Sequence, residues 1–386
     1  MNLSRRSFTL GAAAGALVAV PGANAAFADS ESATGASAAS ASVTTAQETA
    51  QLARLYSAAK AEGGEVTVYM GGDKPGQWDF VAQAFVAAYP NMAIHLITDL
   101  SKIHDARIDN QLANGDLVAD VAILQTADDF ERWKKQGSLL KYKPVGWDRV
   151  YSNAKDPDGY WTAVFYGAFA YMVNTKLLPA DPSTFTAPDL LKPEFKNKLI
   201  FTYPDDDDAV LFFFKLIVDK YGWNWLAQLV AQNPAYVRGT PYSASPVAAG
   251  TYLATAGTTG DPSPDATVVL PSRDPFNSWA QHGAIFSNAK HKAGAKLFTS
   301  WLNSRATQES VIASWTWSVR GDVAPPTGLE PLSSYKTTDP LAFPAFMRDR
   351  AAVERFRSQV QLYVGQVTGP DPADPDNSFG RTPGAF

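Results

Sequence analysis

The chain has 386 residues, of which 46% are hydrophobic and 12% aromatic, enough for roughly two domains with full cores. The formal net charge is −5 and the basic residues are scattered, so the clustered basic face of a nucleic-acid-binding protein is not expected. The lack of cysteine excludes disulfides, thiolate metal sites and cysteine nucleophiles.

Residues 1–28 predict an export signal. Two arginines precede an apolar stretch of about a dozen residues and two A-x-A cleavage sites. The apolar stretch is too short for a membrane span, which needs about 20 residues. Ser4–Phe8 is similar to the twin-arginine export motif, and the alternative is an ordinary secretory signal. Because there is no cysteine for a lipid anchor, we expect a mature protein that is free in the periplasm.

The first half of the mature chain alternates strands with helices. Residues 29–44 are small and polar and predict a disordered lead, and the capping box Thr45–Glu48 predicts the first helix start. The alternation is typical of a parallel sheet with helices on both faces. Strands are predicted at 65–72, 92–98 and 118–126, and helices at 77–89, 102–114 and 127–136.

The second half contains two long extended stretches, at 160–175 and 266–286. Between them and after them, further elements follow the same apolar periodicities. Strands are predicted at 197–204 and 235–239, and helices at 207–221, 223–232, 243–254, 290–303, 306–315 and 345–362, followed by a loose tail at 367–386.

Six segments in this order resemble the periplasmic solute-binding proteins of ABC importers. The resemblance is to the type II, cluster D group that contains the ferric-iron, thiamine and polyamine binders. It covers roughly residues 53–330. The segments are "AKAEGGEVTVYMGG", "ADVAILQTADDFERWKKQGSLLKY", "YGAFAYMVNTKLL", "YVRGTPYSASPVAAGTY", "AIFSNAKHKAGAKLFTSWLNSRATQESV" and "SVRGDVAPP".

The resemblance implies an α/β, two-lobed periplasmic-binding-protein-like fold of type II, with the two crossover strands as its hinge. Such a protein closes on a small-molecule solute and delivers it to an ABC permease in the inner membrane. We expect a monomer without a cofactor. The expected parts are lobe 1 (53–165 plus 277–325), lobe 2 (166–276), C-terminal helices (326–366) and the tail (367–386).

Ligands bind beyond the carboxyl ends of parallel strands, so the loops that follow strands hold the candidate residues. Gly72 and Asp73 follow the first strand, where glycine lets backbone amides approach a ligand, although a plain tight turn would look the same. Thr126 follows the third strand and could instead cap the next helix. Tyr203, Asp205 and Asp206 follow a strand in the second lobe.

Other candidates lie in the crossovers and at a helix start. Tyr166, Asn277 and Trp279 are expected to line the cleft, with core packing as the alternative. Arg238, Thr240 and Ser243 open a helix, which suits a carboxylate or phosphate, although a capped helix with a surface arginine has the same pattern. The predicted ligand-binding residues are therefore Gly72, Asp73, Thr126, Tyr166, Tyr203, Asp205, Asp206, Arg238, Thr240, Ser243, Asn277 and Trp279.

No enzyme motif is present. The histidines lack metal-ligand spacing such as H-x-x-x-H, and there is neither a G-x-S-x-G motif nor a phosphate-binding glycine loop. A secreted hydrolase on a two-lobed scaffold is the rival from another class, but no pair of carboxylates is singled out for it. We therefore predict a binding protein, with no catalytic or resident metal site.

The aspartate run Asp205–Asp208 bears on the choice of ligand. The helix dipole accounts for one or two aspartates as caps, but not for all four. The others could face solvent, pair with Arg238 or Lys215, or contact a ligand. Ferric iron would need anionic oxygen ligands, and the family's adjacent tyrosine pair is absent. An organic ligand that is cationic or polyhydroxylated is the leading expectation, with ferric iron or an anion bound at Arg238 as alternatives.

Overall fold

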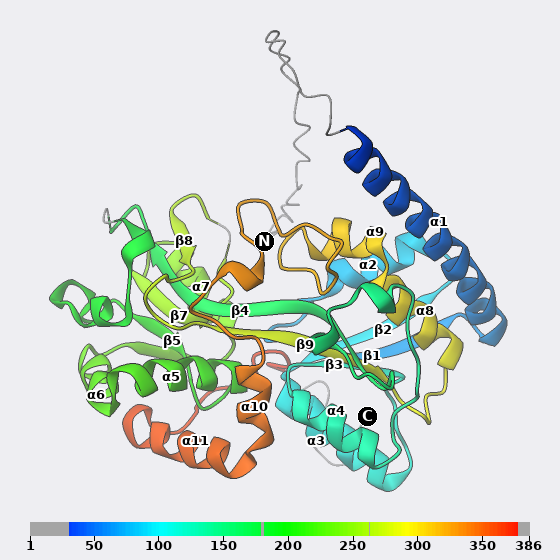
Figure 1. Ribbon diagram of the computed structural model, residues 1–386. Helices are drawn as coiled ribbons and strands as arrows, with labels where there is room; N and C mark the ends of the chain where they lie inside the picture. The colour runs from blue at the N-terminus through cyan, green and yellow to red at the C-terminus, as the bar shows by residue number, and fades with distance from the viewer. Residues whose placement is uncertain (1–30, 179–180, 262, 377–386) are drawn as a thin grey trace, which may run out of the picture. The chain divides into compact units, whose positions relative to one another are not determined.

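The computed structural model describes residues 31–178, 181–261 and 263–376 (Figure 1). The chain divides into two compact units, residues 1–44 and 45–386. The predicted export signal and the last ten residues of the predicted tail, 377–386, lie outside the described residues. Within the described ranges, no helix is both long and apolar enough to cross a membrane.

The first helix, α1 (Glu31–Glu62), begins well before the predicted start at Thr45. The expectation of a disordered lead is therefore wrong from Glu31 onward. This segment is rich in alanine, the strongest helix former, so it can be helical without an apolar periodicity. Glu48 is not a cap either, because its carboxylate accepts a hydrogen bond from the backbone N–H of Arg305 at 2.7 Å and pairs with Arg320 at 2.9 Å.

The main sheet has seven strands in the order β2-β1-β3-β9-β4-β7, with β8 paired to β4. Strand β1 pairs in parallel with β2 and β3, whereas β9 runs antiparallel to both β3 and β4. A second sheet consists of the parallel pair β5 and β6. The strands are β1 (Glu65–Gly71), β2 (Ala93–Asp99), β3 (Val121–Leu124), β4 (Thr162–Asn174), β5 (Ile200–Thr202), β6 (Ala235–Val237), β7 (Ala254–Thr258), β8 (Ala266–Val269) and β9 (Asn277–Ile285).

The helices lie close to their predicted positions. The longer ones are α2 (Asp79–Ala88), α3 (Ser101–Asn114), α4 (Ala127–Lys135), α5 (Asp208–Tyr221), α6 (Trp223–Ala231), α7 (Thr240–Ala248), α8 (Lys292–Asn303), α10 (Ala342–Arg348) and α11 (Arg350–Val364). Short helical turns lie at Trp147–Arg149, Ser152–Ala154, Pro182–Thr184, Ala187–Leu191, Pro193–Phe195, Arg305–Thr307 (α9), Gln308–Ile312 and Leu332–Ser334.

Three expectations about these elements are corrected. The predicted helix 243–254 begins at Thr240 and ends at Ala248, and strand β7 follows it. This strand escapes prediction because its residues are small. They must be small, since a Cβ on Gly257 would meet the Val210 side chain at 3.0 Å. The predicted stretch 266–286 is two strands, and the predicted helix 345–362 is two helices, with Asp349 capping the second.

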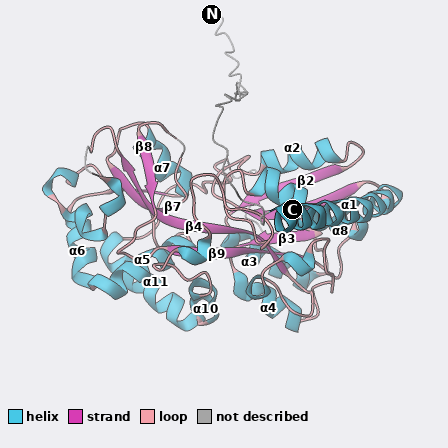
Figure 2. Cartoon of the chain, turned by 45° about the horizontal axis from the view of Figure 1, so that its top comes forward, coloured by secondary structure: helices cyan, strands magenta, loops and turns pink. Residues whose placement is uncertain are grey.

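Strands β4 and β9 form the connection between the two halves of the sheet. All residues of both strands are buried. The first part of β4 pairs with β9, and its last part, Ala170–Asn174, pairs with β7 and β8. Figure 2 shows the two strands running between the β1–β3 region and the region of α5 and α7. We keep the names lobe 1 and lobe 2 for the ranges defined above.

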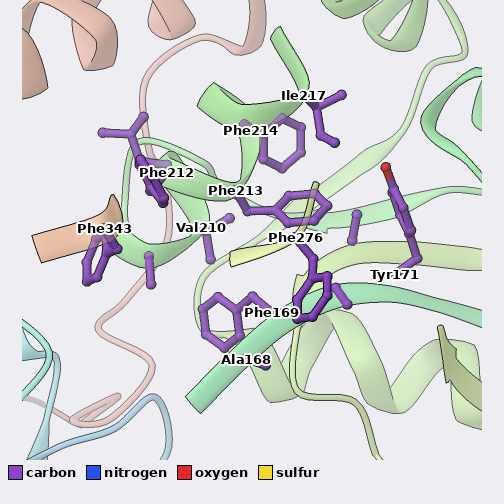
Figure 3. Packing of buried hydrophobic residues seen from close by; sticks show 14 of the residues in the cluster. Ala168, Phe169, Tyr171, Val210, Phe212, Phe213, Phe214, Ile217, Phe276 and Phe343 are labelled. Carbon is purple, nitrogen blue, oxygen red and sulfur yellow. The ribbon is translucent and has the colours of Figure 1, made fainter. Parts of the chain in front are cut away.

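Helix α5 is the buried centre of lobe 2. The consecutive rings of Phe212, Phe213 and Phe214 are all buried and point to different neighbours (Figure 3). Phe213 packs edge-on against Tyr171 of β4, with the ring centroids 5.5 Å apart, and Phe212 lies 5.6 Å from Phe343 of α10. The first turns of the helix, residues 209–214, are apolar on all sides and are therefore enclosed. This packing fixes the position of its first residues, which carry the aspartate run.

Candidate functional site

A cavity of about 80 Å³ lies between the lobes, and we call it the cleft. Its walls come from the loops after parallel strands, as the sequence predicts, and from the crossover strands. Lobe 1 contributes the loop after β1 and the residue after β3, while lobe 2 contributes the starts of α5 and α7. The lining residues are Gly71, Gly72, Asp73, Gln77, Trp78, Ser101, Gln125, Phe165, Gly167, Phe169, Asp207, Thr240, Thr259, Trp279, Gln281 and Trp315.

Asp73 joins the two lobes across the cleft. Its carboxylate accepts hydrogen bonds from the backbone N–H of Thr240, at 3.1 Å, and from the Thr240 hydroxyl. The loop after β1 is also stabilised within lobe 1, because the Asp73 N–H donates to Gln77 Oε1 at 2.7 Å. A buried carboxylate from lobe 1 therefore reaches the N-terminus of a lobe 2 helix, where the helix dipole favours negative charge.

The four aspartates of the run are all buried, and each has its own partner. Asp205 accepts from Gln361 of α11 at 2.9 Å, and the Asp208 carboxylate pairs with Arg357 at 2.5 Å. Asp206 pairs with Arg238 at 2.7 Å and with Lys102 of lobe 1 at 2.8 Å. The expectation of solvent-exposed charges is wrong, whereas the expected pairing with Arg238 is confirmed.

Asp207 is the member of the run that lines the cleft. One carboxylate oxygen caps α5 by accepting from the N–H groups of Ala209 and Val210, at 2.8 and 2.9 Å. The other accepts from Gln125 Nε2 of lobe 1 at 3.0 Å. The predicted helix cap is therefore present at this position, and the same carboxylate also crosses between the lobes.

The two cleft carboxylates resist ionisation. Burial, reinforced by the charge of Asp73, raises the pKa of Asp207 to about 7. Burial likewise raises the pKa of Asp73, against the hydrogen bonds from Thr240. By contrast, although burial opposes ionisation of Asp206, hydrogen bonding to Arg238 and the charge of Lys102 lower its pKa. The cleft thus contains two carboxyl groups whose pKa values are raised, and the described residues of its lining include no cationic side chain.

Aromatic rings form the remaining wall of the cleft. Trp78 and Phe165 lie 5.6 Å apart, and Phe169 and Trp279 lie 4.7 Å apart, measured between ring centroids. The indole of Trp279 lies directly on Gly167, where a Cβ would come within 2.6 Å of it. No lysine, arginine or histidine is among the residues that line this cavity. Two carboxyl groups and a set of ring faces are groups that attract a cation.

Of the predicted ligand-binding residues, the structure brings Gly72, Asp73, Thr240 and Trp279 into the cleft. Asp205 and Asp206 were expected there but instead bind the partners described above. Arg238 is occupied by Asp206 and does not line the cleft, so the predicted anion site at this helix start lacks its cation.

The remaining predicted residues have other positions. Tyr203 bonds to Thr368 at 3.0 Å, and Asn277 donates to the Ala209 carbonyl at 3.0 Å. Ser243 bonds to Thr202 at 3.0 Å within lobe 2. Thr126 is buried as the residue before α4 and does not line the cleft. Tyr166 lines a different cavity, because it points away from its cleft-facing neighbours on β4.

Sequence reasoning missed several residues of the cleft. Asp207 lies in the predicted aspartate run, but it is not among the predicted ligand-binding residues. Gly167 carried a usable signal, because a glycine inside a strand often marks the close approach of another group. The other missed lining residues are apolar or polar residues without a distinctive signal in the sequence: Gln77, Trp78, Ser101, Phe169, Thr259, Gln281 and Trp315.

The described residues contain no group of three or more His, Asp or Glu side chains that could hold a metal ion. Tyrosines are the usual source of anionic oxygen ligands for ferric iron, and Tyr166, Tyr203 and Tyr242 do not meet in the cleft. Tyr166 lines another cavity, and Tyr242 is half-exposed beside Pro372. Neither they nor Tyr203 line the cleft, so the residues that are present do not form a ferric-iron site of the predicted kind.

Comparisons with known proteins agree with this geometry. Residues 116–244 match the family model described as bacterial extracellular solute-binding protein. No curated protein matches the chain. Among solved structures, the periplasmic binding protein AfuA from Actinobacillus pleuropneumoniae, with exogenous fructose-6-phosphate bound, has a TM-score of 0.63 and 18% identity, covering 79% of this chain and 100% of its own.

Two further solved structures have the same fold. Iron-bound HitA from Pseudomonas aeruginosa has a TM-score of 0.60 and 16% identity, covering 77% of this chain and 99% of its own. A periplasmic thiamin binding protein has a TM-score of 0.60 and 19% identity, covering 78% and 96%. The matched family and these neighbours are binding proteins, not enzymes.

The neighbours show that the chain has the two-lobed α/β fold of periplasmic binding proteins, and residues 116–244 match the solute-binding family model. The two-lobed fold that the resemblance implies is confirmed. The neighbours bind chemically different ligands, so the fold does not identify the solute, and the argument for one rests on the cleft.

Proposed function

We propose that this protein captures a small organic cation in its cleft and presents it to the permease of an ABC importer. The observation that carries the choice of ligand is the pair of cleft carboxyl groups, Asp73 and Asp207, whose pKa values are raised by burial and which have no cation beside them in the lining. A bound ammonium group would supply the missing positive charge, and the ring faces of the cleft would hold its alkyl groups.

The rival ligand classes lack equivalent support. A phosphorylated sugar, as in AfuA, would bring negative charge next to the two carboxyl groups, and Arg238 is already paired with Asp206. Ferric iron, as in HitA, would need a cluster of anionic oxygen ligands, which the described residues do not form in the cleft. A neutral polyhydroxylated ligand could donate to the carboxylates, but it would not balance their charge.

Binding is proposed to require closure of the two lobes. Three contacts join the lobes around the cleft: Lys102 to Asp206, Gln125 to Asp207, and Thr240 to Asp73. The first and second of these involve neighbouring residues of one loop, so a shift of the α5 start relative to lobe 1 would break both. Hinge motion at β4 and β9 would accordingly expose the carboxyl groups and admit the solute.

The location of the protein remains a prediction from its first 28 residues and from the matched family, whose members are extracellular solute-binding proteins. We propose export to the periplasm by the twin-arginine route and action as a monomer, without a lipid anchor. Cell fractionation, with the two arginines of the signal changed to lysine, tests the route.

A thermal-shift panel tests the ligand class. Choline, putrescine, glucose, fructose-6-phosphate and ferric citrate would each be added to the purified protein, and native mass spectrometry would identify any solute retained from the cell. A specific ligand at 100 times its Kd stabilises the fold by about 2.7 kcal/mol. We expect such a shift from an organic cation. A shift confined to the sugar phosphate or the ferric salt would overturn the cation proposal, and consumption of any compound would favour the hydrolase.

A further inference from the structure

A second cavity, of about 490 Å³, lies on the other face of strand β4, and we call it the back cavity. Neighbouring residues of β4 face different cavities, since Phe165 lines the cleft and Tyr166 lines the back cavity, and the two cavities share no lining residue among those described. Alternate residues of extended chains point to opposite sides. The back cavity is therefore separate from the solute site.

The hydroxyl of Tyr166 is one of the polar groups in the lining of this cavity. The residue is 5% exposed, and its backbone is fixed by hydrogen bonds to Trp317 O at 3.0 Å and from the Thr316 hydroxyl at 2.5 Å. Among the residues that the structure describes, none forms a hydrogen bond with its phenolic oxygen. Burial raises the pKa of Tyr166, so the hydroxyl keeps its proton and can donate it. Buried tyrosine hydroxyls usually have a partner, and here the cavity supplies the space for one.

The walls are aromatic and rigid. Trp317 donates its indole N–H to Glu330 O at 2.8 Å and packs edge-on against Tyr335, with the centroids 6.0 Å apart. The tilted ring of Tyr151 lies 6.3 Å from that of Tyr166. Three prolines, two leucines and Val323 complete the apolar lining. The surface is thus preformed for a flat apolar body.

Charge is nearly absent from the back cavity. Among the described residues of its lining, Asp339 is the only charged side chain, and its carboxylate accepts a hydrogen bond from the Leu341 N–H at 2.9 Å. An anionic ligand would meet no compensating cation there and would lose its hydration without a partner, whereas a neutral ligand would lose little.

We propose that the back cavity is a second binding site, for an uncharged aromatic or alicyclic molecule that carries an oxygen acceptor for the Tyr166 hydroxyl. Its volume is within the range of about 300–1000 Å³ that is typical of small-molecule sites. This site is independent of the proposed cation cleft, because the two have different lining residues and suit ligands of different charge.

The neutral dye Prodan, a naphthalene with a ketone oxygen, is a suitable probe, since its emission shifts to shorter wavelength in apolar surroundings. We expect a saturable blue shift on titration of the protein, with one dye bound in native mass spectra. Tyr166→Phe removes only the hydroxyl and should weaken Prodan binding roughly threefold to tenfold, the effect of one hydrogen bond. Absence of a saturable shift with the wild-type protein would overturn the proposal.

Matched variants locate the dye. Ser333 and Ser334 are adjacent exposed residues, and only Ser333 lines the back cavity. Ser333→Phe should fill the cavity and abolish the saturable shift, whereas Ser334→Phe should bind as the wild type does. Thr259→Phe narrows the cleft instead and should leave Prodan binding unchanged. Unaltered binding to Ser333→Phe, or loss of binding in Thr259→Phe, would contradict the assignment. Circular dichroism and melting curves confirm that each variant is folded.

Discussion

At the scale of single residues, Asp207 has two roles that a single substitution can separate. It caps α5, which any acceptor side chain could do, and it places a carboxyl group in the cleft. We therefore expect Asp207→Asn to keep the cap and the fold, because asparagine caps helices as well as aspartate does. Loss of the charge should weaken cation binding roughly tenfold to a hundredfold, the range for a charged contact.

Titration calorimetry with the cation identified in the thermal-shift panel measures this change, with Asp219→Asn as the exposed control on the same helix. Equal affinity of Asp207→Asn and the wild type would show that the carboxyl group only caps the helix.

The raised pKa of Asp207 also predicts a pH dependence. In the folded protein this pKa is about 7, above its ordinary value of 3.8, so the folded state retains a proton that the unfolded state has lost. The contribution of Asp207 to stability is therefore present at acid pH and is lost as the pH rises through the window from about 4 to 7. Cation affinity should change in the opposite sense, rising as the pH rises toward 8.

Urea unfolding and calorimetry at pH 5.5, 7 and 8 follow the two trends. Asp207→Asn should flatten both. A cation affinity that is the same at pH 5.5 and pH 8 in the wild type would contradict the role given to the buried carboxyl groups.

Gly167 provides a second test at this scale. A Cβ at this position would come within 2.6 Å of the Trp279 indole, which therefore has to move. We expect Gly167→Ala to weaken solute binding severalfold while the protein stays folded, because the ring wall of the cleft shifts. Tryptophan fluorescence should report the displacement of the indole. Gly137→Ala is the control: its added Cβ would meet no atom within 4 Å, but the backbone there has a φ of +75°, which is strained for alanine. This variant therefore sets an upper limit on the effect of glycine replacement without a steric clash.

At the scale of elements, helix α11 holds the aspartate run in place from outside both lobes. Arg357 donates to the Asp205 carbonyl at 2.6 Å and pairs with Asp208 at 2.5 Å, and its side chain is 15% exposed. Replacing it by methionine leaves the buried Asp208 carboxylate without this cation. We expect Arg357→Met to lower the free energy of unfolding by about 3 kcal/mol or more, the cost of breaking a buried pair.

Chemical denaturation of Arg357→Met and of the exposed neighbour Arg355→Met compares the two arginines directly. A similar small loss in both variants would mean that the ion pair to Asp208 contributes no more than a surface contact.

At the scale of the whole molecule, the segment after α11 closes one edge of lobe 2. Tyr203 bonds to Thr368 at 3.0 Å, Arg238 donates to Gly369 O at 3.4 Å, and Asp371 to Asp374 are buried. The expectation of a loose tail is therefore wrong for these residues. Pro372 lies within 2.9 Å of the point where a Cβ of Gly239 would be, and Asp73 O lies 2.8 Å from the same point. The segment thus reaches the interface between the lobes, which we define here by Asp73 and Gly239.

Removing residues 367–386 should therefore weaken the interface between the lobes. We expect the shortened protein to fold and to release its solute several times faster than the full chain, because contacts at this interface favour the closed arrangement. Stopped-flow dissociation measures the rate. An unchanged rate would show that the segment only covers lobe 2.

The sequence by itself determined the order and type of most elements and, through the family resemblance, the two-lobed fold. Apolar alternation and helical spacing are local properties, so they identify β1–β4, α2–α5 and the crossover strands without knowledge of their neighbours. What only the tertiary structure decided is which way the side chains point. Both faces of β4 are apolar, so parity alone could not assign Phe165 to the cleft and Tyr166 to the back cavity.

The aspartate run shows the same division. Its composition predicted a cap and surplus charge, and both are present. The aspartates that do not cap the helix bind residues that are distant in the chain, and only folding brings these residues to the run. The partners are Lys102, Arg238, Arg357 and Gln361. Local sequence fixes what a residue can do chemically, whereas burial and the neighbours supplied by long-range packing decide which of those possibilities is realised.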